Sequence, residues 1–223
     1  MDAYEQIALA AKRQRLLRNK MSKRIYISAD YDPYTGDRDV IDVLIKWNTS
    51  HKYVVDFVDM AAVTSGSVSS DPDCRPCDLK LEFNKQINAS SVALFVVGNN
   101  TAKRTAGAAC PRTSIPRPLN RCTPYKQNWQ GAKYCRVTNA TLYSKVGDVN
   151  CINNYSYLRH EFEQAKIKNK QIIVVYNSFY KQPSWLPFYL KGYESQAIPF
   201  WTRDILGNKV GNYTAIKSAL GYA

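Results

Sequence analysis

The sequence lacks any long uninterrupted run of apolar residues. A membrane-spanning helix needs about 18–20 such residues in succession, and no segment of the 223-residue chain approaches that length. The N-terminus also lacks the order of a secretory signal, because its basic residues follow its apolar stretch. We therefore expect a soluble, cytoplasmic protein with no membrane partner. With 45% hydrophobic residues, the chain can bury one sizeable core.

Acidic residues are scarce, since 18 Asp and Glu stand against 31 Lys and Arg, and the formal net charge is +13. The basic excess lies in two stretches. Residues 1–24 hold seven basic side chains against two acidic ones, and residues 101–151 hold nine against one. The rest of the chain holds 15 of each sign and is neutral. A basic surface that serves a partner would therefore belong to these two stretches and not to the core.

Short apolar runs alternate with amphipathic segments from residue 23 onward. We expect strands at 23–29, 53–59, 92–98, 171–177 and 197–201, and helices at 37–48, 78–87, 154–169 and from 212. Strands that are apolar throughout are typical of a parallel sheet covered on both faces. The pattern predicts an α/β, flavodoxin-like three-layer sandwich whose five parallel strands follow the order 2-1-3-4-5.

Two segments fall outside this alternation. Residues 1–22 are rich in helix formers and are expected to form an appended N-terminal helix, with Met21 as an alternative start of translation. Residues 101–151 contain prolines and four cysteines but no sustained apolar period. We interpret them as a basic insertion within a single domain that covers residues 23–223.

The insertion carries Cys110, Cys122, Cys135 and Cys151 at spacings of 12, 13 and 16. These spacings lack the paired C-x-x-C knuckles of most zinc modules, although Cys74 and Cys77 form one such pair before the second expected helix. In a cytoplasm, zinc is favoured over disulfides. A zinc site, disulfides and cysteines without any ligand stay open as alternatives.

Polar residues follow the first and third expected strands. Open parallel sheets bind ligands beyond the carboxyl ends of their strands, at the point where the strand order reverses. The hydroxyls, amides, aromatic rings and arginine there suit the ribose, base and phosphates of a nucleotide, although ordinary turns contain many of the same residue types. The candidate binding residues are Ser28, Asp30, Tyr31, Asp32 and Tyr34 after the first strand, and Gly98, Asn99, Asn100, Thr101 and Arg104 after the third.

The helix expected at 154–169 carries the candidate catalytic group. Its apolar stripe consists of Leu158, Phe162 and Ala165, and Glu161 lies off that stripe, one turn beyond Tyr157. Glu161 is therefore expected either to project toward a ligand or to be an exposed glutamate that pairs with a lysine. The neighbouring His160 is expected to be a surface or packed histidine.

Three runs of the sequence resemble TIR-like proteins of bacterial antiphage systems, above all the signal-producing TIR-like protein of Thoeris systems. The runs are KRIYISADYD, VALFVVGNNT and YLRHEFEQAKIKNKQIIVVYNS, and the resemblance covers about residues 23–104 and 152–201. In that family an aromatic residue, an arginine, a variable residue and the catalytic glutamate open the third helix. The matching positions are Leu158, Arg159, His160 and Glu161, with Tyr157 as the aromatic residue. The resemblance thus implies that Glu161 is catalytic and that Tyr157 and Arg159 lie near the substrate.

The resemblance further implies an enzyme that cleaves the bond between nicotinamide and ribose in NAD. A carboxylate is suited to the positive charge that develops on the ribose ring in this reaction. Water, the adenine of the same molecule or another nucleophile would capture the ribosyl cation and give a linear, cyclic or conjugated product. The resemblance also implies self-association and a downstream effector that responds to the product nucleotide.

Two other functions remain open at this stage. TIR folds also serve as non-catalytic adaptors, for which Glu161 would have no role. A nucleic-acid binder could use the two basic segments, where Tyr125, Trp129 and Tyr134 stand among basic residues. The neutral charge of the core argues against this last alternative.

Overall fold

The computed structural model describes residues 23–50, 55–64, 75–104 and 156–222. The expected leader helix (1–22) and most of the insertion (101–151) fall outside these ranges. The predictions of a metal site or disulfides in the insertion therefore fall outside them as well. The described residues contain no helix that is long and apolar enough to cross a membrane.

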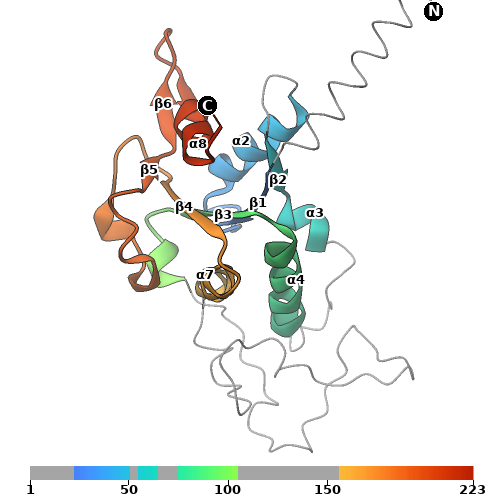
Figure 1. Ribbon diagram of the computed structural model, residues 1–223. Helices are drawn as coiled ribbons and strands as arrows, with labels where there is room; N and C mark the ends of the chain where they lie inside the picture. The colour runs from blue at the N-terminus through green and yellow to red at the C-terminus, as the bar shows by residue number, and fades with distance from the viewer. Residues whose placement is uncertain (1–22, 51–54, 65–74, 105–155, 223) are drawn as a thin grey trace, which may run out of the picture.

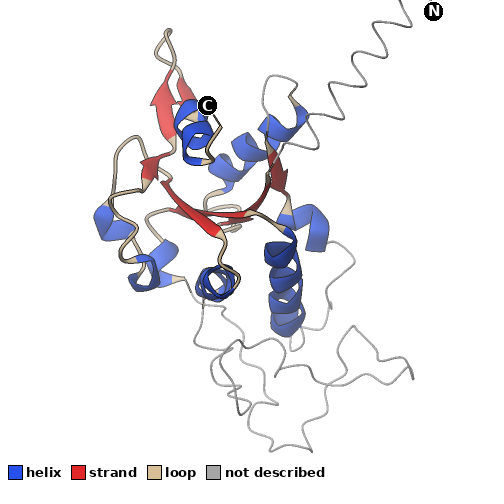
Figure 2. Cartoon of the chain, in the orientation of Figure 1, coloured by secondary structure: helices blue, strands red, loops and turns tan. Residues whose placement is uncertain are grey.

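A five-stranded parallel sheet forms the centre of the fold, in the order β2-β1-β3-β4-β5 (Figures 1 and 2). The strands are β1 (Arg24–Ser28), β2 (Asp56–Val58), β3 (Val92–Val97), β4 (Gln171–Tyr176) and β5 (Ile198–Pro199). All four pairings are parallel. Every residue of β3 is buried, as expected for the middle strand of a sheet that is covered on both faces. The predicted flavodoxin-like α/β fold and strand order are confirmed.

Helices cover the two faces of the sheet (Figure 1). On one face, α2 (Arg38–Thr49) and α8 (Tyr213–Ala219) pack over side chains such as Ile25 and Ile27. On the other face, α4 (Arg75–Ala89) and α7 (Tyr157–Ile167) pack over the alternate positions, which include Tyr26. Successive residues of a strand point to opposite faces, so β1 supplies both cores.

The connections differ from the sequence prediction in several places. A short helix, α3 (Met60–Thr64), follows β2, where the sequence pattern predicted no helix. The fifth strand is reduced to two residues, because the chain leaves the sheet at Phe200 and enters the hairpin β6 (Trp201–Arg203) and β7 (Lys209–Gly211). This hairpin was not predicted, and it extends away from the sheet (Figure 1). The described residues also form three short 3-10 turns: η1 (Thr101–Lys103), η3 (Pro183–Trp185) and η4 (Phe188–Leu190).

Candidate functional site

The loops after β1 and β3 meet at the carboxyl edge of the sheet. These two strands are neighbours and run parallel, with Ser28 opposite Phe95, so both chains leave the sheet on the same side. From β1 the chain passes to β2 on one side, whereas β3 leads toward β4 on the other. This reversal is where open α/β sheets bind ligands, and the sequence placed its candidate residues there.

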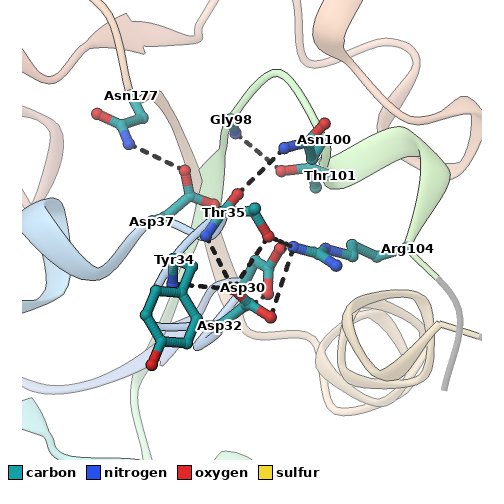
Figure 3. Close-up of polar contacts among 10 residues, drawn as sticks. All are labelled: Asp30, Asp32, Tyr34, Thr35, Asp37, Gly98, Asn100, Thr101, Arg104 and Asn177. Carbon is teal, nitrogen blue, oxygen red and sulfur yellow. Dashed lines mark hydrogen bonds and ion pairs between the residues drawn. The ribbon is translucent and has the colours of Figure 1, made fainter. Parts of the chain in front are cut away.

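An ion pair joins the two loops (Figure 3). The Arg104 guanidinium donates from Nε to Asp30 Oδ2 and from Nη2 to the Thr35 hydroxyl, and Asp32 Oδ2 lies 4.0 Å from Nη2. The Asn100 amide donates to the Thr35 carbonyl at 3.1 Å. Four side chains predicted as nucleotide ligands thus form contacts that fix the two loops relative to each other. They are Asp30, Asp32, Asn100 and Arg104.

The turn after β1 is built around the Asp32 carboxylate. Asp32 Oδ1 accepts hydrogen bonds from the backbone amides of Tyr34 (2.9 Å) and Thr35 (2.8 Å). These bonds lower the pKa of Asp32, because they stabilise its charged form. Gly36 closes the turn, and a Cβ there would lie 2.4 Å from the Asp30 carbonyl oxygen and 2.6 Å from that of Asp32. Only glycine fits this position without moving the backbone.

Replacing Gly36 with Ala is therefore expected to reduce the free energy of unfolding by about 1–3 kcal/mol, the usual cost of forcing a methyl group into a packed site. Urea unfolding followed by circular dichroism would measure the change. Asn99→Ala is the matched control, since Asn99 is exposed on the facing loop. Equal stability of Gly36→Ala and the control would contradict the packing argument.

A second contact tightens the edge beside β3. The Asp37 carboxylate packs against Gly98, where a Cβ would lie 2.2 Å from Asp37 Oδ1. Burial raises the pKa of Asp37 to about 6, although the Asn177 amide, which donates to Asp37 Oδ1 at 3.0 Å, opposes the rise. The Gly98 amide donates to the Thr101 hydroxyl at 2.8 Å. Gly98 is thus needed for close packing in the free protein.

Glu161 is buried, with 5% of its surface exposed. It lies near the start of α7 and accepts a hydrogen bond from the hydroxyl of Ser28, the last residue of β1. Burial raises the pKa of Glu161 to about 8, while the hydroxyls of Ser28 and Tyr26 oppose the rise. The alternative of an exposed glutamate paired with a lysine is therefore wrong. The carboxyl group instead faces the sheet, where the other predicted site residue Ser28 meets it.

The charge of this carboxyl group acts on three tyrosine hydroxyls. They belong to Tyr26 on β1, Tyr31 in the turn after β1 and Tyr189 in η4, and all three are buried without a formed hydrogen bond. For each of them burial raises the pKa, and the negative charge of Glu161 raises it further. The Tyr26 hydroxyl favours the charged form of Glu161, although the two groups form no full hydrogen bond. We call Glu161, Ser28 and these three tyrosines the hydroxyl cluster.

The sequence identified part of this cluster. Ser28, Tyr31 and Glu161 were candidates, whereas Tyr26 and Tyr189 were missed. Tyr26 stands two residues before Ser28, and period-2 alternation places both side chains on one face of β1. That spacing could have identified Tyr26. The contribution of η4 has no local signal, because it depends on how the chain folds back after β4.

The remaining predicted residues lie elsewhere. The Tyr34 side chain is 93% exposed and projects into solvent. Tyr157 packs edge-on against Phe83 of α4, with ring centroids 5.6 Å apart, so it contributes to helix packing. Arg159 and Asn99 are exposed. Of these four residues, Arg159 acts on the hydroxyl cluster, because its positive charge opposes the rise in the pKa of Tyr189.

His160 is a packed histidine, one of the two fates expected for it. It is buried between α7 and α4, and its Nε2 lies 2.9 Å from Asn84 Oδ1. Burial and the charge of Lys80 lower the pKa of His160 to about 3. The imidazole is therefore neutral at physiological pH and serves the helix interface.

Among the described residues, no group of three or more His, Cys, Asp or Glu side chains is arranged to hold a metal ion. The cysteines considered for zinc lie outside the described residues, except Cys77, whose side chain is not described. No protein-family model matches the chain, and no curated protein and no solved structure is significantly similar to it.

Proposed function

We propose that the chain is a TIR-like, NAD-consuming enzyme that cleaves the bond between nicotinamide and ribose, with Glu161 as its catalytic residue. One observation carries the proposal. Glu161 is a buried carboxyl group at the carboxyl edge of the sheet, and the described groups that act on it are neutral hydroxyls. The resemblance of the sequence around Glu161 to TIR-like enzymes supports the same assignment.

Among the described residues, only hydroxyl groups act on the buried Glu161 carboxyl group, and such a site favours a positively charged ligand. Burial makes ionisation of Glu161 unfavourable in the free protein, and a cationic group beside it would reverse that effect. The nicotinamide ring of NAD carries a positive charge, and this charge passes to the ribose as the bond breaks. Glu161 would thus gain its strongest partner at the transition state, which is the condition for catalysis.

The reaction needs no acid to release the leaving group. The bond between ribose C1 and the nicotinamide nitrogen breaks, and its electron pair neutralises the nicotinamide ring. The ribosyl cation then bonds to water, to the adenine of the same molecule or to another nucleophile, which loses a proton. The product is accordingly ADP-ribose after capture by water, cyclic ADP-ribose after capture by the adenine, or a conjugate. In the proposed pathway this product signals to a downstream effector in antiphage defence.

The loops after β1 and β3 would hold the rest of the substrate. Arg104 is partly exposed, and its guanidinium group would donate to the phosphates while it keeps its ion pair with Asp30. Tyr31 and Ser28 lie within the hydroxyl cluster, next to the proposed position of the ribose. Gly98 and Asn99 belong to the turn that borders this position. Self-association of the active protein, expected from the family resemblance, belongs to the same proposal.

The proposed mechanism has a defined pH dependence. Since the free protein holds Glu161 with a pKa of about 8, most molecules carry a neutral carboxyl group at pH 7. We therefore expect kcat/KM for NAD to rise about tenfold per pH unit below pH 8 and to level off above it, because kcat/KM reports the groups of the free enzyme. A rate that is flat or falls between pH 6 and 8 would contradict this role of Glu161.

The direct test is incubation of the purified full-length chain with NAD, followed by mass spectrometry of the products. The expected result is free nicotinamide together with linear, cyclic or conjugated ADP-ribose. The assay should be repeated with a crowding agent and with phage lysate, because TIR enzymes often need self-association or a trigger. Intact NAD under all three conditions would overturn the proposed function.

A further inference from the structure

β1 presents two hydroxyl groups to the same carboxyl group. Tyr26 and Ser28 are separated by two positions, so both side chains point to the face of the sheet that α7 covers. Ser28 Oγ donates a hydrogen bond to Glu161 Oε2. The Tyr26 hydroxyl lies beside the same carboxyl group, and Tyr26 is completely buried.

The Tyr26 hydroxyl has an unusual position for a buried polar group. Such groups are normally hydrogen-bonded, because an unpaired one loses its interaction with water and gains nothing in return. The Tyr26 oxygen has no formed hydrogen bond within the described chain, yet it faces a carboxyl group. A hydrogen bond from this hydroxyl to the Glu161 carboxyl group would be strongest when the acceptor is charged.

We propose that Tyr26 and Ser28 are positioning residues that together hold the ionised Glu161 carboxylate in its working orientation. The inference rests on the proposed function, because the two hydroxyls have this task only if Glu161 must be charged during the reaction. In the free protein Ser28 alone makes its bond. When a cationic substrate ionises Glu161, Tyr26 adds the second bond, and the carboxylate is held by two donors from one strand.

The other ionisable groups around Glu161 do not compete for this role. Tyr31 in the turn after β1 and Tyr189 in η4 both have a pKa raised by burial and by the charge of Glu161, and both phenols stay neutral at physiological pH. The charged groups that act on these phenols are Asp59 and Arg38 for Tyr31 and Arg159 for Tyr189. Only Ser28 and Tyr26 favour the charged form of Glu161 among the described residues.

The test is a pH titration of Glu161 itself. Difference infrared spectroscopy follows the band of the protonated carboxyl group, and the band that is absent in Glu161→Gln identifies the residue. We expect Ser28→Ala and Tyr26→Phe each to raise the titration midpoint by about one pH unit, because each removes one donor to the carboxylate. Tyr176→Phe is the matched control. Tyr176 is also a buried tyrosine with an unpaired hydroxyl, but the charge that acts on it belongs to Glu194.

The kinetic counterpart is a parallel shift of the pH–rate profile. At pH 7 we expect kcat/KM for NAD to fall about tenfold in Tyr26→Phe and to recover toward the wild-type value above pH 9, because one pH unit of midpoint is tenfold in the ionised fraction. An unchanged midpoint in both β1 variants, or an equal shift in Tyr176→Phe, would overturn the inference. If Tyr26→Phe does not fold, Ser28→Ala decides the outcome. If the titration midpoint of Glu161 shifts in these variants but the protein leaves NAD intact, the interaction of Tyr26 and Ser28 with Glu161 stands and only the proposed function is rejected.

Discussion

Replacing Glu161 with Gln is expected to lower the rate of NAD cleavage at least about a thousandfold while the fold is retained. Removal of one preorganised electrostatic group from an active site typically costs a factor of 10²–10³, and here the whole negative charge is lost. The amide can still accept the hydrogen bond from Ser28, so the local packing is preserved. The loss would be measured as the rate of nicotinamide release at pH 8, with chromatography used to quantify the nicotinamide.

Glu163→Gln is the matched control for this experiment. Glu163 stands on the same helix two positions later and is partly exposed, so the substitution removes the same charge outside the hydroxyl cluster. The control should retain its rate within a factor of about two. Equal turnover by Glu161→Gln and the wild type would remove Glu161 from the mechanism.

Glu161→Gln is also expected to stabilise the protein at alkaline pH. Burial raises the pKa of Glu161 from an ordinary value of 4.5 to about 8. Between these values the folded protein binds a proton that the unfolded chain does not hold, so the stability of the wild type falls as the pH rises through this range. The glutamine side chain of the variant has no such proton to lose, so the variant escapes this loss of stability. The difference should reach a few kcal/mol above pH 8 and should vanish near pH 4.

Urea unfolding of the wild type and of Glu161→Gln at pH 5, 7 and 9 would measure this difference. The free energies of unfolding should diverge as the pH rises, with the variant more stable. Glu163→Gln again serves as the control, and its difference from the wild type should be small at every pH. A Glu161→Gln variant that is less stable than the wild type at pH 9 would show that the carboxylate is stabilised in the folded protein. A gain in stability together with a loss of activity is the expected signature of a functional group.

The sequence predicted the sheet well, because its strands are short apolar runs separated by turn residues. The run at 92–97 is apolar at every position and could be assigned to the middle of a parallel sheet. The hairpin of β6 and β7 could not be predicted in this way. Each of its strands has three residues, too few for an alternating pattern, and it is held by contacts such as that of the Lys209 ammonium over the Trp201 ring at 3.7 Å.

The site was predicted less completely, for a reason that α7 illustrates. A stripe of Leu158, Phe162 and Ala165 predicted which side of the helix is buried, and Glu161 was placed off that stripe. The helix packs against α4, β3 and η4 at once, so its buried arc is wider and includes Glu161. Which polar residue enters such an arc depends on neighbours that are distant in the sequence. The bond between Ser28 and Glu161 spans 133 positions.

The carboxyl edge of the sheet also limits the length of one connection. A single added methyl group at Gly36 would meet three backbone atoms within 3 Å, so the turn between Asp30 and Asp37 has no room for extra atoms. Related sequences should therefore keep the length of the turn from Asp30 to Asp37.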